Sequence, residues 1–471
     1  MKNKIRDYIR DNRENIIDMI KALVEIPSVR NDGDENAPFG KSCLDALKKV
    51  EEIYSSDGYK TEIEENKNYL IGLSEGDEKV IGVFAHSDVV PADVADWEYT
   101  SPFKPIEKDG FLIGRGVEDN KSGVVGAIWA LRALKNADAF PKSKVLLYTG
   151  SDEENGMSDI VEFTKKCKMP DFSIVPDNEY PVCRGEKTIV DFFIKFNKPF
   201  DDIIAINGGE AFNITLGKVS VTLKNDDDLF EELEWIVRDV KECTISKDFE
   251  DITLTAVGKS THAAHPDDSL NALLIAIDVL TKCSLSKNDK IILENARKLV
   301  SNPYFEGVNL STTDSEFGKT TTVNGIALTE EGRLKLSFDC RFGSEIDTDA
   351  LINSYKEFFN SINADYIEVK RLDGYSISEN DPLIKAVMEA FVDVTGDNSK
   401  KSYLSFGGTY ARFLKNAVST GTYIPVTPKF KMPEGHGSVH QPDEVLDIEG
   451  FLHGIEILAH MILKADDVLH K

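Results

Sequence analysis

The sequence predicts an α/β protein of two domains, and three observations support this. The 471 residues exceed what one hydrophobic core usually holds, so more than one domain is expected. Between residues 40 and 183, short apolar runs alternate with helical patterns, which is typical of an α/β domain. From about residue 186 to 378 strands and helices continue, but the acidic residues that follow the earlier strands disappear. We therefore expect two domains of different character.

Composition and charge narrow the class of protein. Hydrophobic residues make up 41% of the chain and the net charge is −27, so we expect a soluble protein that binds neither nucleic acid nor an anionic membrane. The six cysteines are scattered without a CxxC pair, as in reduced cytoplasmic proteins. The first 30 residues lack the apolar core of a signal peptide. A cytoplasmic location is expected.

Hydrophobic periodicity predicts the main elements. Apolar residues recur at helical spacing from Ile16 to Val24, so an amphipathic helix is expected that ends near Pro27. In the α/β part we expect helices over 43–54, 124–134 and 445–463, and strands over 69–73, 80–85, 144–149 and 172–175.

The strand over 80–85 leads directly into His86, Ser87 and Asp88. Because side chains alternate along a strand, His86 and Asp88 should project to the same side. An imidazole beside a carboxylate suits a metal ligand and the group that orients it. The alternative is an ordinary histidine at a strand end followed by a turn aspartate.

Further ligand-type residues follow other predicted elements. Open α/β sheets place functional residues at the carboxyl ends of their strands. Asp119 precedes a buried helix without a GxxxxGK[ST] phosphate motif, so it favours a cation. The complete candidate set is His86, Asp119, Glu153, Glu154, Asp177 and one of two downstream histidines, His436 or His440.

These residue types suit a pair of divalent ions. Two such ions, about 3.5–4 Å apart, need a bridging carboxylate and further imidazole and carboxylate ligands. Zinc accepts nitrogen and oxygen ligands, and manganese or cobalt tolerate them. A further carboxylate must take the proton of the activated water, and adjacent glutamates such as Glu153 and Glu154 could divide these roles.

The segments HSDVVP, DGFLIGRGVEDNKSG, SDEENG, VPDNEYPV, GTYAR and HQPDE together resemble the co-catalytic metallopeptidase family. That family includes aminoacylases, carboxypeptidase G, carnosinases and bacterial dipeptidases. The chain is most similar to its PepV-type (Xaa-His dipeptidase) branch, whose PD-x-E-x-P-V and GGTYAR segments match Asp177 to Val182 and Gly407 to Arg412. Asn120 and Ser122 depart from the usual pattern, but neither is a ligand position.

The resemblance implies a set of metal ligands. His86 and Asp177 would bind one ion, Glu154 and His440 the other, and Asp119 would bridge them. Zinc is the favoured metal, with manganese or cobalt as alternatives.

Two further roles at this centre follow from the resemblance. Asp88 would orient His86, and Glu153 would be the general base and acid. His440 is preferred to His436 because it begins the H-x-x-x-E pattern of the family. The bridging aspartate of the family precedes a cis peptide bond.

The resemblance also implies how the chain is divided. Residues 1–185 and 379–471 would form a zinc-exopeptidase-like catalytic domain, with a central mixed sheet flanked by helices. Residues 186–378 would form an inserted α+β lid. His262, in a G-x-x-x-H-x-x-x-P motif, would bind the oxyanion, and Asn213 and Arg341 would hold the substrate's terminal carboxylate. Gly408 and Thr409 would also contact the substrate.

The predicted function is that of a metal-dependent dipeptidase, a metallopeptidase that uses a water activated by two metal ions. An alternative within enzymes is an N-acyl amino acid deacylase of the desuccinylase or aminoacylase type. From another class, the chain could be a binding protein without activity, but it retains every expected ligand and Glu153. The long lid, with similar stretches at 217–223 and 332–338, predicts a monomer.

Overall fold

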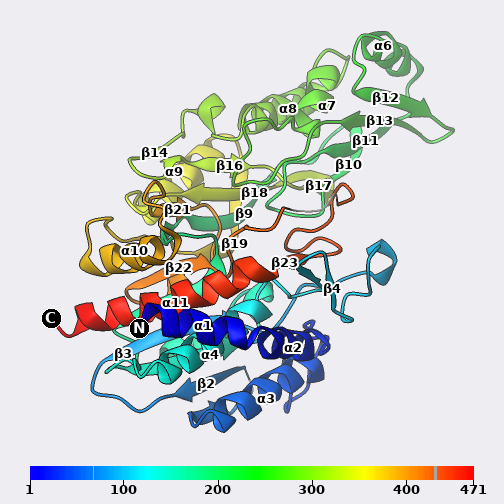
Figure 1. The fold of residues 1–471 in the computed structure, drawn as a ribbon. Coiled ribbons are helices and arrows are strands. Elements are labelled where there is room, and N and C mark those ends of the chain that lie inside the picture. Colours follow the sequence, from blue (N-terminus) through cyan, green and yellow to red (C-terminus); the bar gives the residue numbers. More distant parts are fainter. Residues whose placement is uncertain (67, 429–431) are drawn as a thin grey trace. The chain divides into compact units, whose positions relative to one another are not determined.

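The computed structural model describes residues 1–66, 68–428 and 432–471 (Figure 1). The chain forms two compact units. Unit 1 comprises Met1–Gly185 and Ser376–Lys471, and unit 2 comprises Glu186–Tyr375. The mixed α/β fold class is confirmed.

Unit 1 is built on a mixed sheet in the order β1-β2-β6-β3-β7-β22-β8-β20, with β21 paired to β8. Strands β6, β3, β7 and β22 run parallel, whereas β1 and β2 are antiparallel to their neighbours. The strands of the sheet are β1 (Lys60–Ile63), β2 (Tyr69–Leu73), β3 (Val80–His86), β6 (Lys144–Gly150), β7 (Phe172–Asn178), β8 (Cys183–Glu186), β20 (Tyr375–Ser376), β21 (Tyr403–Ser405) and β22 (Ala417–Gly421).

Helices cover both faces of this sheet. They are α1 (Lys2–Asp11), α2 (Arg13–Val24), α3 (Lys41–Ser56), α4 (Lys121–Asn136), α5 (Ser158–Lys166), α10 (Pro382–Thr395) and α11 (Ile448–Leu469). Alternate residues of β3 show the two faces. Ile81 and Val83 belong to the core that includes α3 and α4, whereas the Phe84 ring lies 5.4 Å from that of Phe163 on α5.

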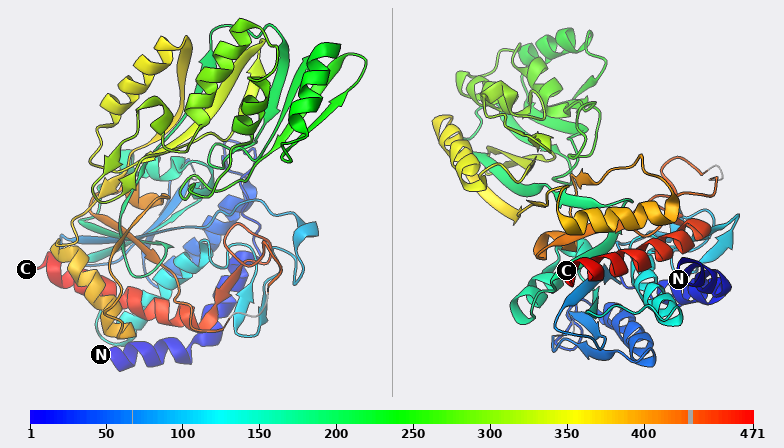
Figure 2. Two further views of the ribbon diagram at one scale, coloured as in Figure 1. Left: turned by 90° about the horizontal axis from the view of Figure 1, so that it is seen from above. Right: turned by 60° about the vertical axis from the view of Figure 1, so that its left-hand side comes forward.

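The ends of unit 1 are joined through its helices. Helices α1 and α11 lie side by side in all views (Figures 1 and 2). Arg6 donates from Nε to both carboxylate oxygens of the buried Glu456, at 3.2 and 3.0 Å. This bidentate pair connects the first helix to the last.

A small sheet in unit 1 corrects one prediction. Strands β4 (Ile106–Lys108), β5 (Phe111–Ile113) and β23 (Val445–Asp447) pair in the order β23-β5-β4. The helix expected over 445–463 therefore begins only at Ile448, because the three preceding residues form a strand. The Asp447 carboxylate accepts a hydrogen bond from Gly450 N at 2.9 Å and caps the helix.

The helix expected from Ile16 to Val24 is confirmed as α2. A further helix, α1, was not predicted and precedes it, and the two meet at Asn12. The Asn12 side chain donates to the Tyr8 carbonyl at 2.9 Å. Asparagine competes for backbone hydrogen bonds in this way and is a poor residue for a helix interior.

Unit 2 is built on an antiparallel sheet in the order β12-β13-β11-β10-β17-β18-β9-β19, with β16 paired to β18. These strands are β9 (Thr188–Phe196), β10 (Ile203–Gly208), β11 (Lys218–Lys224), β12 (Cys243–Lys247), β13 (Asp251–Val257), β16 (Thr321–Val323), β17 (Ala327–Glu330), β18 (Arg333–Phe342) and β19 (Ala364–Leu372). The strands β14 (Thr313–Asp314) and β15 (Gly318–Lys319) form a separate hairpin, and β20 (Tyr375–Ser376) lies where the chain returns to unit 1.

One face of the unit 2 sheet carries the core. The helices α6 (Asp227–Val237), α7 (Ala272–Leu280), α8 (Lys287–Val300) and α9 (Thr348–Ser361) pack on it. On β18, Leu336, Phe338 and Cys340 belong to this core. The alternate residues, including Asp339 and Arg341, therefore point to the opposite face.

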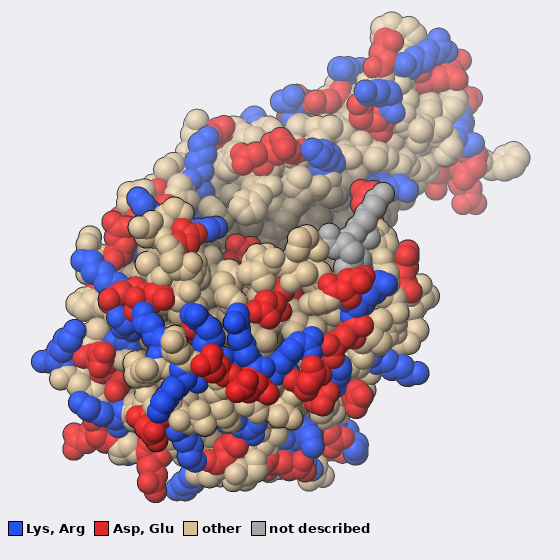
Figure 3. All heavy atoms as spheres, viewed as in Figure 1, with Lys and Arg blue, Asp and Glu red and all other residues tan. Residues whose placement is uncertain are grey.

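The surface and the cysteines agree with the composition. Basic and acidic side chains are interspersed on the face shown in Figure 3. All six cysteines are unpaired. The cytoplasmic location stays a prediction.

Among the described residues, the helices include none with the length and apolar character needed to cross a membrane.

Candidate metal centre

The candidate ligands of unit 1 gather at the carboxyl ends of parallel strands. His86 is the last residue of β3 and lies opposite Gly150, the last residue of β6. Glu153 begins the short helix η2 (Glu153–Asn155), directly after β6. Asp177 is the second-to-last residue of β7. The sheet thus brings together residues that lie far apart in the sequence.

Asp119 lies between the two candidate imidazoles. His86 Nε2 is 3.1 Å from Asp119 Oδ1 and 3.7 Å from Asp177 Oδ1. On the other side, His440 Nε2 is 3.0 Å from Asp119 Oδ2 and 3.1 Å from Glu154 Oε2. One carboxylate therefore faces both histidines, each of which has a second carboxylate beside it.

Two sets of ligand atoms are close enough to hold an ion. The atoms within each set lie within 4.8 Å of one another, and the sets are His86 with Glu153 and Asp177, and His86 with Asp119 and Glu154. Glu154 Oε1 is buried and has no hydrogen-bond partner among the described residues. An unsatisfied buried carboxylate oxygen among imidazoles and carboxylates fits a divalent cation.

Asp88 contacts His86 and the backbone N–H groups of Glu153 and Glu154. His86 Nδ1 lies 3.0 Å from the Asp88 carbonyl oxygen and 3.4 Å from Asp88 Oδ1. The same carboxylate accepts hydrogen bonds from Glu153 N at 3.3 Å and Glu154 N at 3.1 Å. It is fully buried, so it can orient the His86 ring and the start of η2 together.

Glu444 holds the loop that carries Asp119. Its buried carboxylate accepts hydrogen bonds from the backbone N–H groups of Gly116, Glu118 and Asp119 at 3.0, 2.9 and 3.1 Å. Arg115 Nη1 donates to it at 2.7 Å. The peptide bond between Asp119 and Asn120 is cis, which confirms that prediction.

His436 belongs to a different network. Its Nδ1 lies 2.7 Å from Asp443 Oδ2. The Asp443 carboxylate also accepts hydrogen bonds from Glu98 N and Tyr99 N, both at 3.0 Å. Of the two histidines, the structure brings His440 to Asp119 and Glu154, and gives His436 a bond to a loop carboxylate.

The close carboxylates shift one another's pKa values. Burial raises the pKa of Glu153 well above its usual value, and the Asp177 carboxylate raises it further. Burial likewise raises the pKa of Asp177 to about 7. Burial alone would raise the pKa of Asp119, but hydrogen bonds from His440 and His86 bring it below its usual value. These shifts are typical of a functional site.

Sequence reasoning missed two residues that support this centre. Tyr410, in the short helix η4 (Tyr410–Phe413), donates to Asp159 Oδ2 at 2.6 Å. That oxygen also accepts hydrogen bonds from Ser151 N and Asp152 N at 2.8 and 3.0 Å. The pair connects the GGTYAR segment to the loop before Glu153. In the sequence, Asp159 looks like an ordinary surface residue of a helix, so nothing there indicates this role.

The remaining predicted site residues divide between the units. Thr409 is buried in unit 1, and its hydroxyl accepts a hydrogen bond from Ala411 N at 3.1 Å. Gly408 precedes it. In unit 2, Asn213 Nδ2 lies 3.5 Å from His262 Nε2. Burial lowers the pKa of His262 and Arg341 lowers it further, so Arg341 belongs to the same group.

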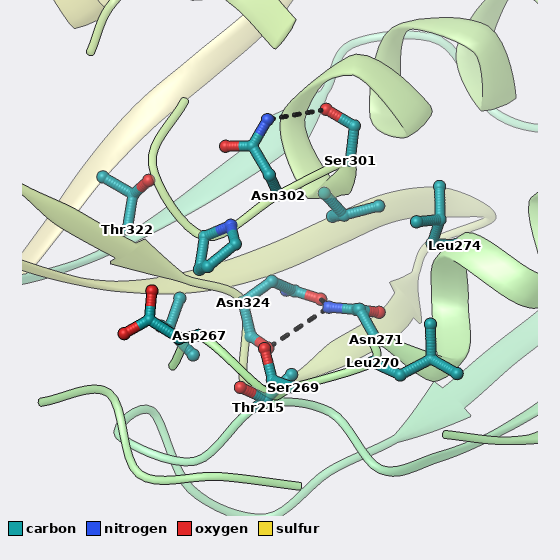
Figure 4. Close-up of a pocket in the computed structure, with 13 residues that line it drawn as sticks. Thr215, Asp267, Ser269, Leu270, Asn271, Leu274, Ser301, Asn302, Thr322 and Asn324 are labelled. Carbon is teal, nitrogen blue, oxygen red and sulfur yellow. Dashed lines mark hydrogen bonds between the residues drawn. The ribbon is translucent and has the colours of Figure 1, made fainter. Parts of the chain in front are cut away.

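Each unit contains a cavity, and that of unit 1 is lined by two of the predicted ligands. In unit 1, a cavity of about 280 Å³ is lined by Glu118, Asp119, Asn120, Asp177, Asn178, Glu179, Thr422 and Val439. In unit 2, a cavity of about 220 Å³ lies beside Thr215 and Asp267 (Figure 4). Asn271 Nδ2 donates to Asn324 Oδ1 at 3.0 Å along its wall. The unit 1 cavity adjoins the candidate centre through Asp119 and Asp177.

Metal binding should release protons. Hydrogen bonds with Asp119 and Glu154 raise the pKa of His440 to about 10. A metal binds neutral imidazole, so below this pH the ion must displace a proton. Zinc affinity should therefore rise between pH 6 and 8, by about tenfold per pH unit for each proton displaced. Calorimetry of the metal-free protein in buffers of different ionisation enthalpy measures the release. Zinc affinity that is independent of pH would contradict the assignment of His440 as a ligand. The control variant His453→Gln, on a helix away from the centre, should show the proton release of wild type.

Comparisons with known proteins identify the family and the fold. The model of peptidase family M20/M25/M40 matches residues 82–464. The chain is 26% identical over 478 residues to "Putative dipeptidase" of Staphylococcus epidermidis, covering 98% of each chain. Its structure resembles the di-peptidase Dug1p from Saccharomyces cerevisiae with a TM-score of 0.60 and 13% identity, covering 99% of both chains.

A further solved structure supports the same fold. It is YXEP of Bacillus subtilis, described as a dinuclear metal binding peptidase, with a TM-score of 0.51, 13% identity and coverage of 97% of this chain and 99% of that chain. The family expected from the sequence motifs is confirmed, because its model matches far more than half of the residues. The chain belongs to peptidase family M20/M25/M40.

Proposed function

We propose that this chain is a metal-dependent dipeptidase. The observation that carries the proposal is the position of Asp119 between His86 and His440, with Asp177 and Glu154 on either side. Family membership and the dipeptidase names of similar proteins support it.

Five residues would hold two divalent ions. His86 and Asp177 would bind one ion, Glu154 and His440 the other, and Asp119 would bind both. Imidazole nitrogen and carboxylate oxygen suit zinc, and manganese or cobalt are alternatives. When bound, such ions activate a water molecule as nucleophile and polarise the carbonyl group of the substrate.

Glu153 would move the proton in the reaction. Its carboxylate lies in the same cluster as His86 and Asp177. It would accept a proton from the water and pass it to the leaving amine. Asp88 would hold Glu153 through its backbone N–H and would orient His86 through Nδ1.

Residues of unit 2 would recognise the substrate. Arg341 and Asn213 would bind the terminal carboxylate of the dipeptide, because a guanidinium and an amide both donate to carboxylate oxygens. His262 would donate to the oxygen that becomes negative during the reaction. In unit 1, Gly408 and Thr409 would contact the substrate.

The roles of the carboxylates can be separated by mutation. Glu153→Ala should lower kcat by about 10²–10⁴-fold, because general acid–base catalysis contributes that much, yet it should still bind two ions. Asp119→Ala should lose metal, because both ions depend on it. Metal content is measured by mass spectrometry and activity by release of free amino acid. The exposed Glu75→Ala is the control and should keep both properties. If Glu153→Ala lost its metal, Glu153 would be a ligand instead of the base.

A substrate panel separates dipeptidase from deacylase. The alternative function is hydrolysis of N-acyl amino acids, which share the amide and free carboxylate of a dipeptide. We expect hydrolysis of Ala-Ala type dipeptides, with N-acetyl and N-succinyl amino acids as poor substrates. Dipeptide amides should be poorer by about ten- to a hundredfold in kcat/KM, because a charge-assisted hydrogen bond is lost. Preference for an N-acyl amino acid would favour the deacylase.

We further propose that the protein acts as a monomer in which His262 serves its own chain. The long insert of residues 186–378 supports this, because a lid of that length needs no help from a partner. Inactive His262→Ala and Glu153→Ala chains are mixed and refolded together, with each variant refolded alone as the control. The mixture should stay inactive, because no active site regains both residues. Recovered activity would show that His262 acts across chains.

A further inference from the structure

The cavity of unit 2 lies between its sheet and its helices. Thr322 of β16, Leu274 of α7 and Val300 at the end of α8 line it. Thr322 pairs with Cys340, a core residue of the helix-covered face, whereas Arg341 points to the opposite face. The described residues that line the cavity include none of those proposed to bind the metal ions or the substrate.

One hydroxyl group in the wall is buried without a partner. Thr322 is only 1% exposed, and its Oγ1 has no hydrogen-bond partner among the described residues. Figure 4 shows this hydroxyl on the side of Thr322 that faces the other lining residues. An unpaired buried hydroxyl lowers stability, so a ligand that pairs with it is favoured.

The charge of the wall is negative. Asp267 is the charged side chain among the described residues that line the cavity. The Tyr304 hydroxyl donates to Asp267 Oδ1, which leaves Oδ2 to accept a hydrogen bond from a ligand. Helix α8 ends at Val300, and the carbonyl groups at the end of a helix carry partial negative charge. The cavity therefore favours a cation.

Two consecutive residues connect the polar groups of the wall. Thr322 N donates to the Pro303 carbonyl at 2.7 Å, and the next residue, Tyr304, donates to Asp267. Figure 4 shows Thr322 and Asp267 on the same side of the cavity. One cationic group with several N–H donors can therefore contact both residues.

The other side of the cavity is apolar. In Figure 4, Leu270 and Leu274 lie across the cavity from Thr322 and Asp267. An inorganic ion gains nothing from such a wall, whereas the hydrocarbon part of an amine is buried against it. Because a cavity of about 150 Å³ holds benzene, the volume of about 220 Å³ has room for roughly nine non-hydrogen atoms.

We propose that this cavity binds a small aliphatic primary ammonium compound. The ammonium group donates to Asp267 Oδ2 and to Thr322 Oγ1, and the hydrocarbon part packs against Leu270 and Leu274. The site goes beyond the proposed dipeptidase function and does not depend on it.

The test is a titration of the full chain with n-pentylammonium chloride at constant ionic strength, followed by NMR of the ligand. Pentan-1-ol has the same length without the charge and is the control ligand. Wild type should bind the ammonium ion at least about fivefold more tightly than the alcohol, because its hydrogen bonds are charge-assisted.

Variants of the wall locate the site. Thr322→Val should weaken binding of the ammonium ion by about tenfold or more, since a hydrogen bond to a charged group is lost. Thr322→Ser keeps the hydroxyl and should bind as wild type. Asp267→Asn should weaken binding by about three- to fivefold, because this carboxylate is exposed. Asp268→Asn removes the same charge from the next residue, outside the described lining, and should bind as wild type.

Three results would overturn the proposal. They are the lack of saturable binding to wild type, equal affinity for the alcohol and the ammonium ion, and full affinity in both Thr322→Val and Asp267→Asn. If Thr322→Val does not fold, the comparison of Asp267→Asn with Asp268→Asn decides. Equal affinity of these two variants would then overturn the proposal.

Discussion

The arrangement of the candidate metal centre depends on the buried carboxylate of Glu444. It accepts three backbone hydrogen bonds and one from Arg115, and so fixes the loop of Gly116 to Asp119. A buried carboxylate with several donors is strongly held, and its removal would leave those donors unsatisfied. Glu444 also lies four residues after His440. Arg115, which donates to Glu444, also donates from Nη2 to the His440 carbonyl at 3.2 Å, so the Arg115–Glu444 pair contacts the segments of both Asp119 and His440.

The buried carboxylates of the candidate centre are stabilised in their charged form by positive charge nearby. Burial and mutual repulsion raise the pKa values of Glu153 and Asp177, whereas the two histidines stabilise the charge of Asp119. Imidazolium groups offset only part of the negative charge. Divalent cations offset it more fully and reverse the direction of such shifts. The charge of the cluster therefore fits its interpretation as a candidate metal site.

Much of this arrangement could be predicted because it follows strand ends. An apolar run such as Val80 to Ala85 defines its strand, and the strand end defines where His86 lies. The preference for His440 over His436 came from the H-x-x-x-E pattern of the family that the sequence resembles. The physical reason is visible only in the structure, where Asp443 binds His436 in a separate network. A hydrogen bond between loop residues has no periodic signal in the sequence.

Other features escaped prediction for similar physical reasons. The strand Val445–Asp447 is too short to separate from the helix that follows, since both are apolar. Tyr410 and Asp159 meet only after folding, through a bond across 251 positions of sequence. Short strands and long-range polar contacts depend on tertiary pairing, which overrides local preference.

In unit 2, the register of β18 decides which polar side chains lie next to one another. Asp339 and Asp191 are paired across two strands, yet only Asp339 forms the bidentate bond with Arg341. The difference arises because Arg341 lies on the same strand as Asp339, two residues away. A shift of one residue in β18 would turn both side chains into the apolar core. The same alternation that buries Phe338 and Cys340 therefore keeps the guanidinium on the polar face.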